Sequence, residues 1–151
     1  MIERLVRENT PQWEVFIENF MTRNRNIVIR NENSVTTLHE FNMALTHLHD
    51  EVCPYYYRAR AYKDTLEKLI DRTIKSATGD NLKNESARRS HGINLCTNFE
   101  VNGYSYNLYD YLDHWNYLES LLESLMKSIK FKADAKITNN SLLNIERSLI
   151  R

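Results

Sequence analysis

The feature that most constrains this chain is an uninterrupted heptad pattern in its first half. Apolar and small residues recur in alternating steps of three and four, at Leu38, Phe41, Leu45, Leu48, Val52, Tyr55, Ala59, Tyr62, Leu66, Leu69 and Thr73. Such spacing places the side chains on one stripe of an α-helix and is typical of helices that pack along their length. The pattern predicts one long helix over residues 36–78, with a capping box of Thr37 and Glu40 and a stop at Gly79.

Pro54 lies inside this predicted helix. Proline has no backbone N–H and clashes with the preceding turn, so it kinks or breaks a helix. Because the heptad phase is the same on both sides of Pro54, we expect a kinked but continuous helix. Two helices separated at Cys53 are the alternative.

The same spacing returns near the C-terminus and predicts a second long helix over residues 107–136. Its positions are Tyr111, Trp115, Leu118, Leu122, Leu125 and Ile129. We expect this broad apolar stripe to pack on the first one. The segment Thr138–Ser141 is typical of a capping loop, and a short amphipathic helix is predicted after it, over residues 141–151. That helix carries Leu142, Ile145, Leu149 and Ile150.

The other segments predict smaller elements. Thr10 and Pro11 are typical of a helix start, and the resulting N-terminal helix and its connector occupy residues 1–32. A polar, weakly periodic stretch predicts a third helix over residues 81–97, which could equally be partly mobile. Residues 99–106 alternate around Asn102-Gly103, the pair that a type I′ hairpin turn prefers. The sequence therefore predicts a single all-α domain over residues 1–151, with one small hairpin.

Composition supports a globular helical chain and gives no sign of a membrane. Of the 151 residues, 42% are hydrophobic and 26% are charged, with only three glycines and two prolines. Glu3, Arg4, Arg7 and Glu8 interrupt the N-terminal stretch, which argues against a signal peptide or a membrane span there. Cys53 and Cys96 lie far apart without metal-ligand spacing, as in a reducing compartment. We expect a cytoplasmic protein.

No residue pattern indicates catalysis or a cofactor. A group of possible ligands stands in the first long helix, at His39, His47, His49, Asp50, Glu51 and Cys53. His47 and Glu51 would share a helix face, but no zinc-site motif completes the set. There is also no nucleophile elbow and no phosphate-binding glycine loop. We expect neither an enzyme nor a bound metal.

Charge is more informative locally than in total, since 20 Lys and Arg balance 20 Asp and Glu. One stripe of the first long helix carries Arg58, Thr65, Lys68, Arg72 and Lys75, and another carries Asp64, Glu67 and Asp71. A phosphate backbone would follow the basic stripe, although a solvated helix face explains it equally well. A second basic group comprises Lys127, Lys130, Lys132 and Lys136.

The segment between Glu100 and Glu123 differs from both basic groups. It holds Asp110, Asp113 and Glu119 but no lysine or arginine, together with several tyrosines. An acidic, aromatic surface suits a protein partner or a neighbouring subunit better than DNA.

Two stretches resemble the UvsY-type recombination mediators of T-even and related phages. Trp115 to Leu118, followed by Leu125 to Ala135, is similar to that family's Trp-led helix that runs into an Ile-Lys-x-basic segment. Arg58-Ala59-Arg60 stands near the family's Lys-x-Arg motif that contacts DNA, with arginine in place of the lysine. The resemblance concerns mainly residues 108–151 and more loosely residues 38–75.

The resemblance implies a ring-shaped homo-oligomer, assembled through the C-terminal helices, that binds single-stranded DNA and helps to load a recombinase. Its partners would be single-stranded DNA, the single-strand binding protein that coats it, and the recombinase. We predict DNA contacts at Arg58, Arg60, Lys68, Arg72, Lys127, Lys130 and Lys132, and oligomer contacts at Leu142, Ile145, Leu149 and Ile150. The alternative is a small helical interaction module or inhibitor that binds a host protein without nucleic acid.

Overall fold

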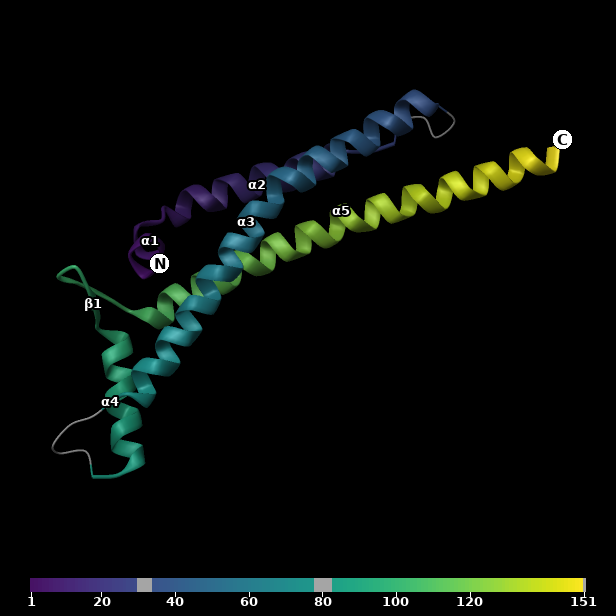
Figure 1. The fold of residues 1–151 in the computed structure, drawn as a ribbon. Helices are drawn as coiled ribbons and strands as arrows, with labels where there is room; N and C mark the ends of the chain where they lie inside the picture. The colour runs from purple at the N-terminus through teal and green to yellow at the C-terminus, as the bar shows by residue number, and fades with distance from the viewer. Residues whose placement is uncertain (30–33, 78–82, 151) are drawn as a thin grey trace. The chain divides into compact units, whose positions relative to one another are not determined.

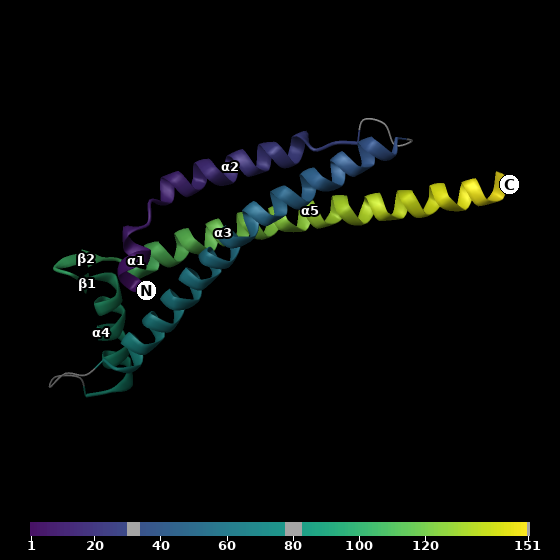
Figure 2. The same cartoon turned by 45° about the horizontal axis from the view of Figure 1, so that its top comes forward.

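The structure is a computed structural model that describes residues 1–29, 34–77 and 83–150, without the side chains of residues 136–148 and 150. The described elements follow in the order α1 (Ile2–Arg7), α2 (Thr10–Asn26), α3 (Val35–Lys75), α4 (Glu85–Thr97), β1 (Phe99–Val101), β2 (Tyr104–Tyr106) and α5 (Leu108–Ile150) (Figures 1 and 2). The all-α fold class is confirmed, with its two long helices and small hairpin.

Helix α3 runs through Pro54 without a break, so the prediction of a continuous helix is confirmed. Its start lies earlier than predicted, because the backbone N–H of Thr37 donates to Ser34 Oγ at 3.3 Å. The capping box of Thr37 and Glu40 was therefore wrong, and both residues lie inside the first turns. Serine is as good an N-cap as threonine, and the earlier cap lets α3 begin at Val35. Gly79, the predicted stop, lies outside the described residues.

Helix α5 continues through the segment that we predicted to be a loop. Residues 141–150 are helical as expected, but they extend α5 and do not form a separate helix after Thr138–Ser141. The segment contains neither glycine nor proline, and Thr, Asn and Ser each cost only about 0.7 kcal/mol or less relative to alanine in a helix. Capping residues alone did not end the helix.

The short elements agree in type with the sequence, with one omission. Helix α4 is capped by Asn84, whose Oδ1 accepts a hydrogen bond from Ala87 N–H at 2.7 Å. Strands β1 and β2 pair antiparallel, and Asn102 and Gly103 take positive φ values of 52° and 82°, as a type I′ turn requires. Helix α1 was not predicted, because six residues are too short to show a helical period.

The described chain divides into two compact units that share the two long helices. Unit 1 comprises Met1–Thr10 and Tyr57–Ser120, and unit 2 comprises Pro11–Tyr56 and the residues from Leu121 onward. We predicted one domain, and neither unit is a continuous stretch of sequence because α3 and α5 each contribute to both.

The core of unit 1 contains an aromatic pair. The rings of Tyr62 on α3 and Trp115 on α5 meet edge to face, with centroids 4.7 Å apart, and both side chains are buried. Helix α4 lies close against the end of α3, since a Cβ on Gly92 would stand only 2.7 Å from Ile74 Cα. Only glycine permits this approach.

Unit 2 is a three-helix arrangement of α2 with parts of α3 and α5. The ring of Tyr55 on α3 receives the rings of Trp13, Phe16 and Phe20 from α2, at centroid distances of 5.1, 5.8 and 5.6 Å. Asn24 Nδ2 on α2 donates to Ser128 Oγ on α5 at 2.9 Å. Buried Leu45, Leu48, Val52, Leu122, Leu125 and Ile129 confirm that the predicted stripes of both long helices lie in the core.

Candidate functional site

The residues predicted to contact DNA fall into two groups in different units. Arg58, Arg60, Lys68 and Arg72 lie on the part of α3 that belongs to unit 1. Lys127, Lys130 and Lys132 lie on the part of α5 that belongs to unit 2. Each group is therefore considered by itself.

Three of the α3 cations share one side of the helix. At 3.6 residues per turn, Arg58 and Arg72 differ by only about 40° in direction, and Lys68 lies about 40° beyond Arg72. All three are exposed. Arg58 Nη1 stands 4.0 Å from Glu8 Oε1, so part of its charge is already balanced by the chain that follows α1.

Arg60 lies on a different side of α3. Two residues along a helix correspond to about 200°, which places Arg60 between the directions of Asp64 and Glu67. Its neighbours on the helix are therefore the acidic stripe. The arrangement separates the two arginines of the Arg58-Ala59-Arg60 motif.

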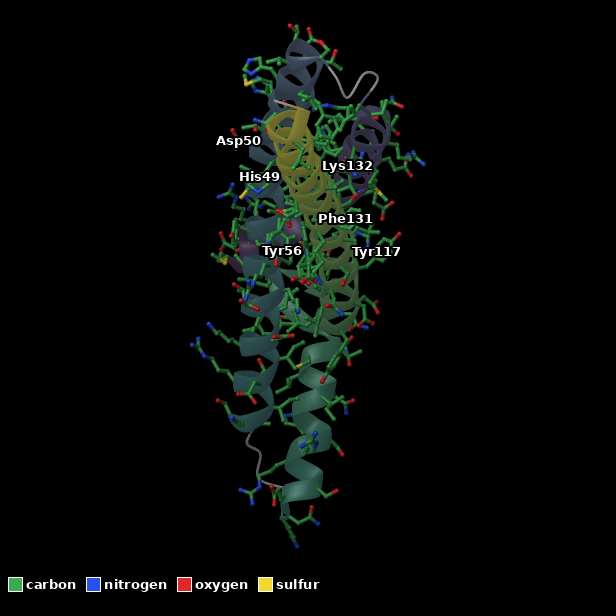
Figure 3. All side chains as sticks on the ribbon, turned by 90° about the vertical axis from the view of Figure 1, so that its right-hand side faces the viewer. His49, Asp50, Tyr56, Tyr117, Phe131 and Lys132 are labelled. Carbon is green, nitrogen blue, oxygen red and sulfur yellow. The ribbon has the colours of Figure 1, made fainter. Side chains whose placement is uncertain are left out.

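Lys132 stabilises the fold of unit 2. Its ammonium group donates to the backbone carbonyls of Asn24 and Ile27, the latter at 3.1 Å, at the C-terminal end of α2. The Asn24 carbonyl also accepts a hydrogen bond from the backbone N–H of Ile27 at 3.2 Å, and a cation at this end of α2 complements the helix dipole. Burial lowers the pKa of Lys132 from its ordinary value. Figure 3 labels this lysine on α5 beside the exposed Phe131.

The two remaining lysines border an open groove between α3 and α5 of unit 2. Lys127 Nζ lies 3.3 Å from Glu123 Oε1, one turn earlier on α5, whereas Lys130 forms no ion pair with a described residue. The groove has a volume of about 490 Å³. Its lining residues are Asn42, Leu45, Thr46, His49, Tyr56, Glu123, Met126, Lys127, Ile129, Lys130 and Ala133.

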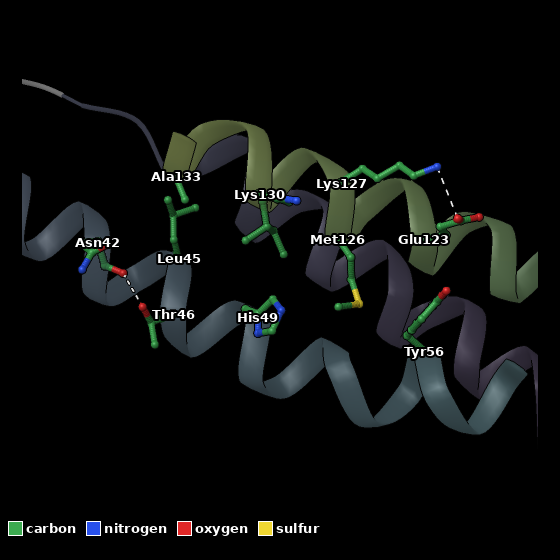
Figure 4. A pocket seen from close by; sticks show the side chains of 11 residues that line it. Asn42, Leu45, Thr46, His49, Tyr56, Glu123, Met126, Lys127, Lys130 and Ala133 are labelled. Carbon is green, nitrogen blue, oxygen red and sulfur yellow. Dashed lines mark hydrogen bonds and ion pairs between the residues drawn. The ribbon is translucent and has the colours of Figure 1, made fainter. Parts of the chain in front are cut away.

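Figure 4 shows how the groove is built. Leu45 points from α3 toward Ala133, and Met126 points down from α5 toward α3, so apolar side chains form the floor. Helix α2 passes behind the α3–α5 pair in this view. The groove thus occupies the side of the pair that α2 leaves uncovered.

The aromatic residues divide between core and surface. Trp115, Tyr62, Trp13 and Phe20 are buried, which agrees with a packing role. Tyr104 in the hairpin and Tyr117 on α5 are 70% and 56% exposed. This division agrees with the predicted stripe of the second long helix, which includes Trp115 and does not include Tyr117.

The histidines of α3 form no metal site among the described residues. No group of three or more His, Cys, Asp or Glu side chains there could hold an ion. His49 Nδ1 lies 3.7 Å from Asp50 Oδ1, and Glu51 pairs with Arg23 of α2. The hydrogen bond that Arg23 donates to Glu51 holds the pKa of the Glu51 carboxyl below its ordinary value.

For the predicted oligomer contacts, the structure describes one side chain. Leu149 is 79% exposed, whereas the side chains of Leu142, Ile145 and Ile150 lie outside the description. Phe131, on the same helix, is 73% exposed. Phe131 was not among the predicted oligomer contacts, although steps of four and three residues connect it with Leu142 and Leu149.

Comparisons with protein-family models, with curated proteins and with solved structures found no match to this chain.

Proposed function

We propose that this protein is a homo-oligomeric, single-stranded-DNA-binding protein of the recombination-mediator type. The observation that carries the proposal is the exposed basic stripe of Arg58, Lys68 and Arg72 on α3 in unit 1. Lys68 and Arg72 form no ion pair with a described residue. A role in loading a recombinase onto coated DNA rests on the resemblance to UvsY-type mediators.

Because salt screens exposed charges from one another, a chain without net charge can still bind DNA through a local basic stripe. At physiological salt the field of an exposed charge extends only about 8 Å, so acidic groups on the other side of α3 offset the stripe weakly. Of the seven predicted contacts, we retain Arg58, Lys68, Arg72 and Lys130 in this proposal. Arg60 lies among acidic residues, Lys127 pairs with Glu123, and Lys132 binds the end of α2.

Assembly is proposed to use the last part of α5. Phe131, Ala135, Thr138, Leu142, Ile145 and Leu149 follow alternating steps of four and three, and α5 is helical throughout. These positions therefore share one stripe by helical register. Leucine at a positions and isoleucine at a d position favour three or four helices over two. The stripe covers fewer than three heptads, which is short for a stable pair of helices.

The DNA proposal is tested by salt-dependent binding of labelled oligo(dT), measured by fluorescence anisotropy. Each phosphate neutralised on a single strand contributes a slope of about −0.7 to log K against log salt. The Lys68→Ala, Arg72→Ala double variant should therefore flatten the slope by about 1.4. Arg60→Ala is the matched control on the same helix and should leave the slope unchanged.

The results that contradict DNA binding are distinct from a failure to fold. Circular dichroism should show the same helix content in wild type and both variants, because all three side chains are exposed. If wild type does not bind oligo(dT) at low salt, or if the double variant keeps the wild-type slope, the mediator proposal is wrong.

The assembly proposal is tested by truncating the chain after Asn139. The truncated protein should contain fewer subunits per particle, as calculated from its mass by light scattering at micromolar concentration, because it lacks Leu142, Ile145 and Leu149. An unchanged number of subunits would show that the stripe is not the contact between copies.

The second candidate is a protein-interaction module that acts without nucleic acid. The open groove of unit 2 and the exposed Tyr117 favour it, since apolar surface of this kind usually marks a protein contact. It becomes the preferred function if oligo(dT) does not bind.

A further inference from the structure

Two exposed surfaces lie outside the basic stripe of α3 and outside the stripe at the end of α5. One is the groove of unit 2, between α3 and α5. The other lies on α5 in unit 1 and is called the tyrosine ridge; it comprises Asp110, Asp113, Asn116, Tyr117 and Ser120.

The tyrosine ridge combines one large aromatic side chain with acidic and small neighbours. Asp110, Asp113, Tyr117 and Ser120 follow steps of three and four residues, which puts them on one face of the helix. All are exposed, and neither aspartate forms an ion pair with a described residue. Ser120 is small, so another helix can approach the ring of Tyr117 closely.

The groove offers the complementary chemistry. Leu45, Met126 and Ala133 provide an apolar floor, and a flexible methionine adapts readily to an aromatic ring (Figure 4). At the edge, Glu123 already pairs with Lys127, so Lys130 is the cation without a partner among the described residues.

The tyrosine ridge and the groove match in the spacing of their residues and also in their charge. Asp113 precedes Tyr117 by four residues, which is about 6 Å along a helix. Lys130 follows Met126 by the same four residues and the same rise of about 6 Å. A tyrosine placed over Met126 therefore brings an aspartate one turn away into reach of Lys130.

From this match we infer that the groove of one copy receives the tyrosine ridge of a second copy. The apolar contact of Tyr117 supplies most of the affinity, because a buried tyrosine is a common anchor of protein interfaces. The Asp113–Lys130 pair supplies orientation and specificity, since exposed ion pairs contribute little energy. The occupant of the groove is thus this chain itself.

The contact joins two different surfaces and is therefore heterologous. Each copy keeps a free groove and a free ridge, so copies add head to tail and form a closed ring or an open chain. This contact shares only Lys130 with the proposed DNA contacts and uses residues outside the stripe at the end of α5. Truncation after Asn139 and changes at the groove consequently test different contacts.

Charge reversal provides the first test. Asp113→Lys and Lys130→Asp should each weaken self-association at least tenfold in sedimentation velocity at low salt, because like charges then meet across the contact. A 1:1 mixture of the two variants, or one chain with both changes, should recover association. Glu67→Lys changes the net charge by the same amount as Asp113→Lys and should have no effect. If the single variants associate as wild type does, or if the mixture does not recover, the inference is wrong.

A cross-link provides the second test and does not depend on the strength of the contact. Tyr117→Cys and Met126→Cys variants, each with Cys53→Ser and one with a size tag, are mixed and oxidised. A disulfide needs Cα atoms about 4.4–6.8 Å apart, so a mixed dimer should form only if ridge and groove meet. Ser90→Cys, exposed on α4, replaces Tyr117→Cys as the control. A mixed dimer no more abundant than in this control would contradict the contact.

Discussion

The two units of this protein expose opposite kinds of surface. Unit 1 buries an aromatic pair, Tyr62 and Trp115, and leaves the basic stripe of α3 in solvent. Unit 2 uses a cation, Lys132, to hold its own helices together and leaves an apolar groove open. Both units carry clusters of lysine or arginine on long helices, but in unit 2 one member of the cluster, Lys132, is part-buried and bound to backbone carbonyls.

The role of a basic cluster depends on which groups lie opposite to it. Arg72 is exposed and forms no ion pair with a described residue, so its charge is available to a phosphate. Lys132 has the end of α2 opposite, so its charge is used within the fold. Three predictions test this contrast, beginning with the largest expected effect.

Replacing the aromatic centre of unit 1 should have the largest effect. Trp115→Ala removes a fully buried ring that meets Tyr62 edge to face, and a cavity of this kind costs about 3–5 kcal/mol in the free energy of unfolding. Urea denaturation followed by circular dichroism measures the loss. Asn116→Ala, exposed at the next position, should change the stability by less than about 0.5 kcal/mol. Equal losses in the two variants would contradict the described core.

Replacing Lys132, the part-buried cation of unit 2, should have an intermediate effect. Lys132→Met keeps the aliphatic stem but removes the donor to the Ile27 carbonyl and one of the two donors to the Asn24 carbonyl, and a buried group that loses its partner costs about 1–3 kcal/mol. Lys130→Met, two residues earlier and exposed, should cost less than about 0.5 kcal/mol. Should the two substitutions be equally mild in urea denaturation, Lys132 would belong with the exposed cations.

High pH should have the smallest effect and should act on unit 1. Burial raises the pKa of Tyr62 above its ordinary value of 10.0, and the nearby Glu8 carboxylate adds to the rise. As the pH passes about 10, the unfolded chain releases this proton before the folded chain does, so stability falls with rising pH. The same sign holds for Tyr109 and Tyr111, whose pKa values burial also raises.

The variant Tyr62→Phe separates the contribution of Tyr62 to the loss of stability at high pH from the contributions of the other tyrosines. Stability of the variant, measured by urea denaturation between about pH 9 and pH 11, should fall less steeply than that of wild type. Tyr104→Phe is the control, because its ring is 70% exposed in the folded chain. A fall as steep in Tyr62→Phe as in wild type would exclude Tyr62 as a source of the alkaline loss.

Local patterns predicted the elements well where apolar residues recur at regular spacing or where the backbone needs φ angles that few residue types adopt. The three–four spacing from Leu38 to Thr73 was enough to predict α3 through Pro54, and Asn102-Gly103 was enough to predict the hairpin. Capping residues were weaker signals. Ser34, not Thr37, caps α3, and Thr138–Ser141 does not interrupt α5, because a residue that can cap a helix can also stand inside one.

An all-α chain with two long helices, their apolar stripes and the positions of the charges along them follow from the sequence alone. Which of these charges remain available to a partner depends on the packing of the helices. Helical register separates Arg58 from Arg60 within α3, but the pairing of Arg58 with Glu8 and of Lys132 with the end of α2 joins residues far apart in the chain. Periodicity records which side of its own helix a residue occupies. It does not record which other element lies opposite, and that neighbour decides whether a cation serves the fold or a partner.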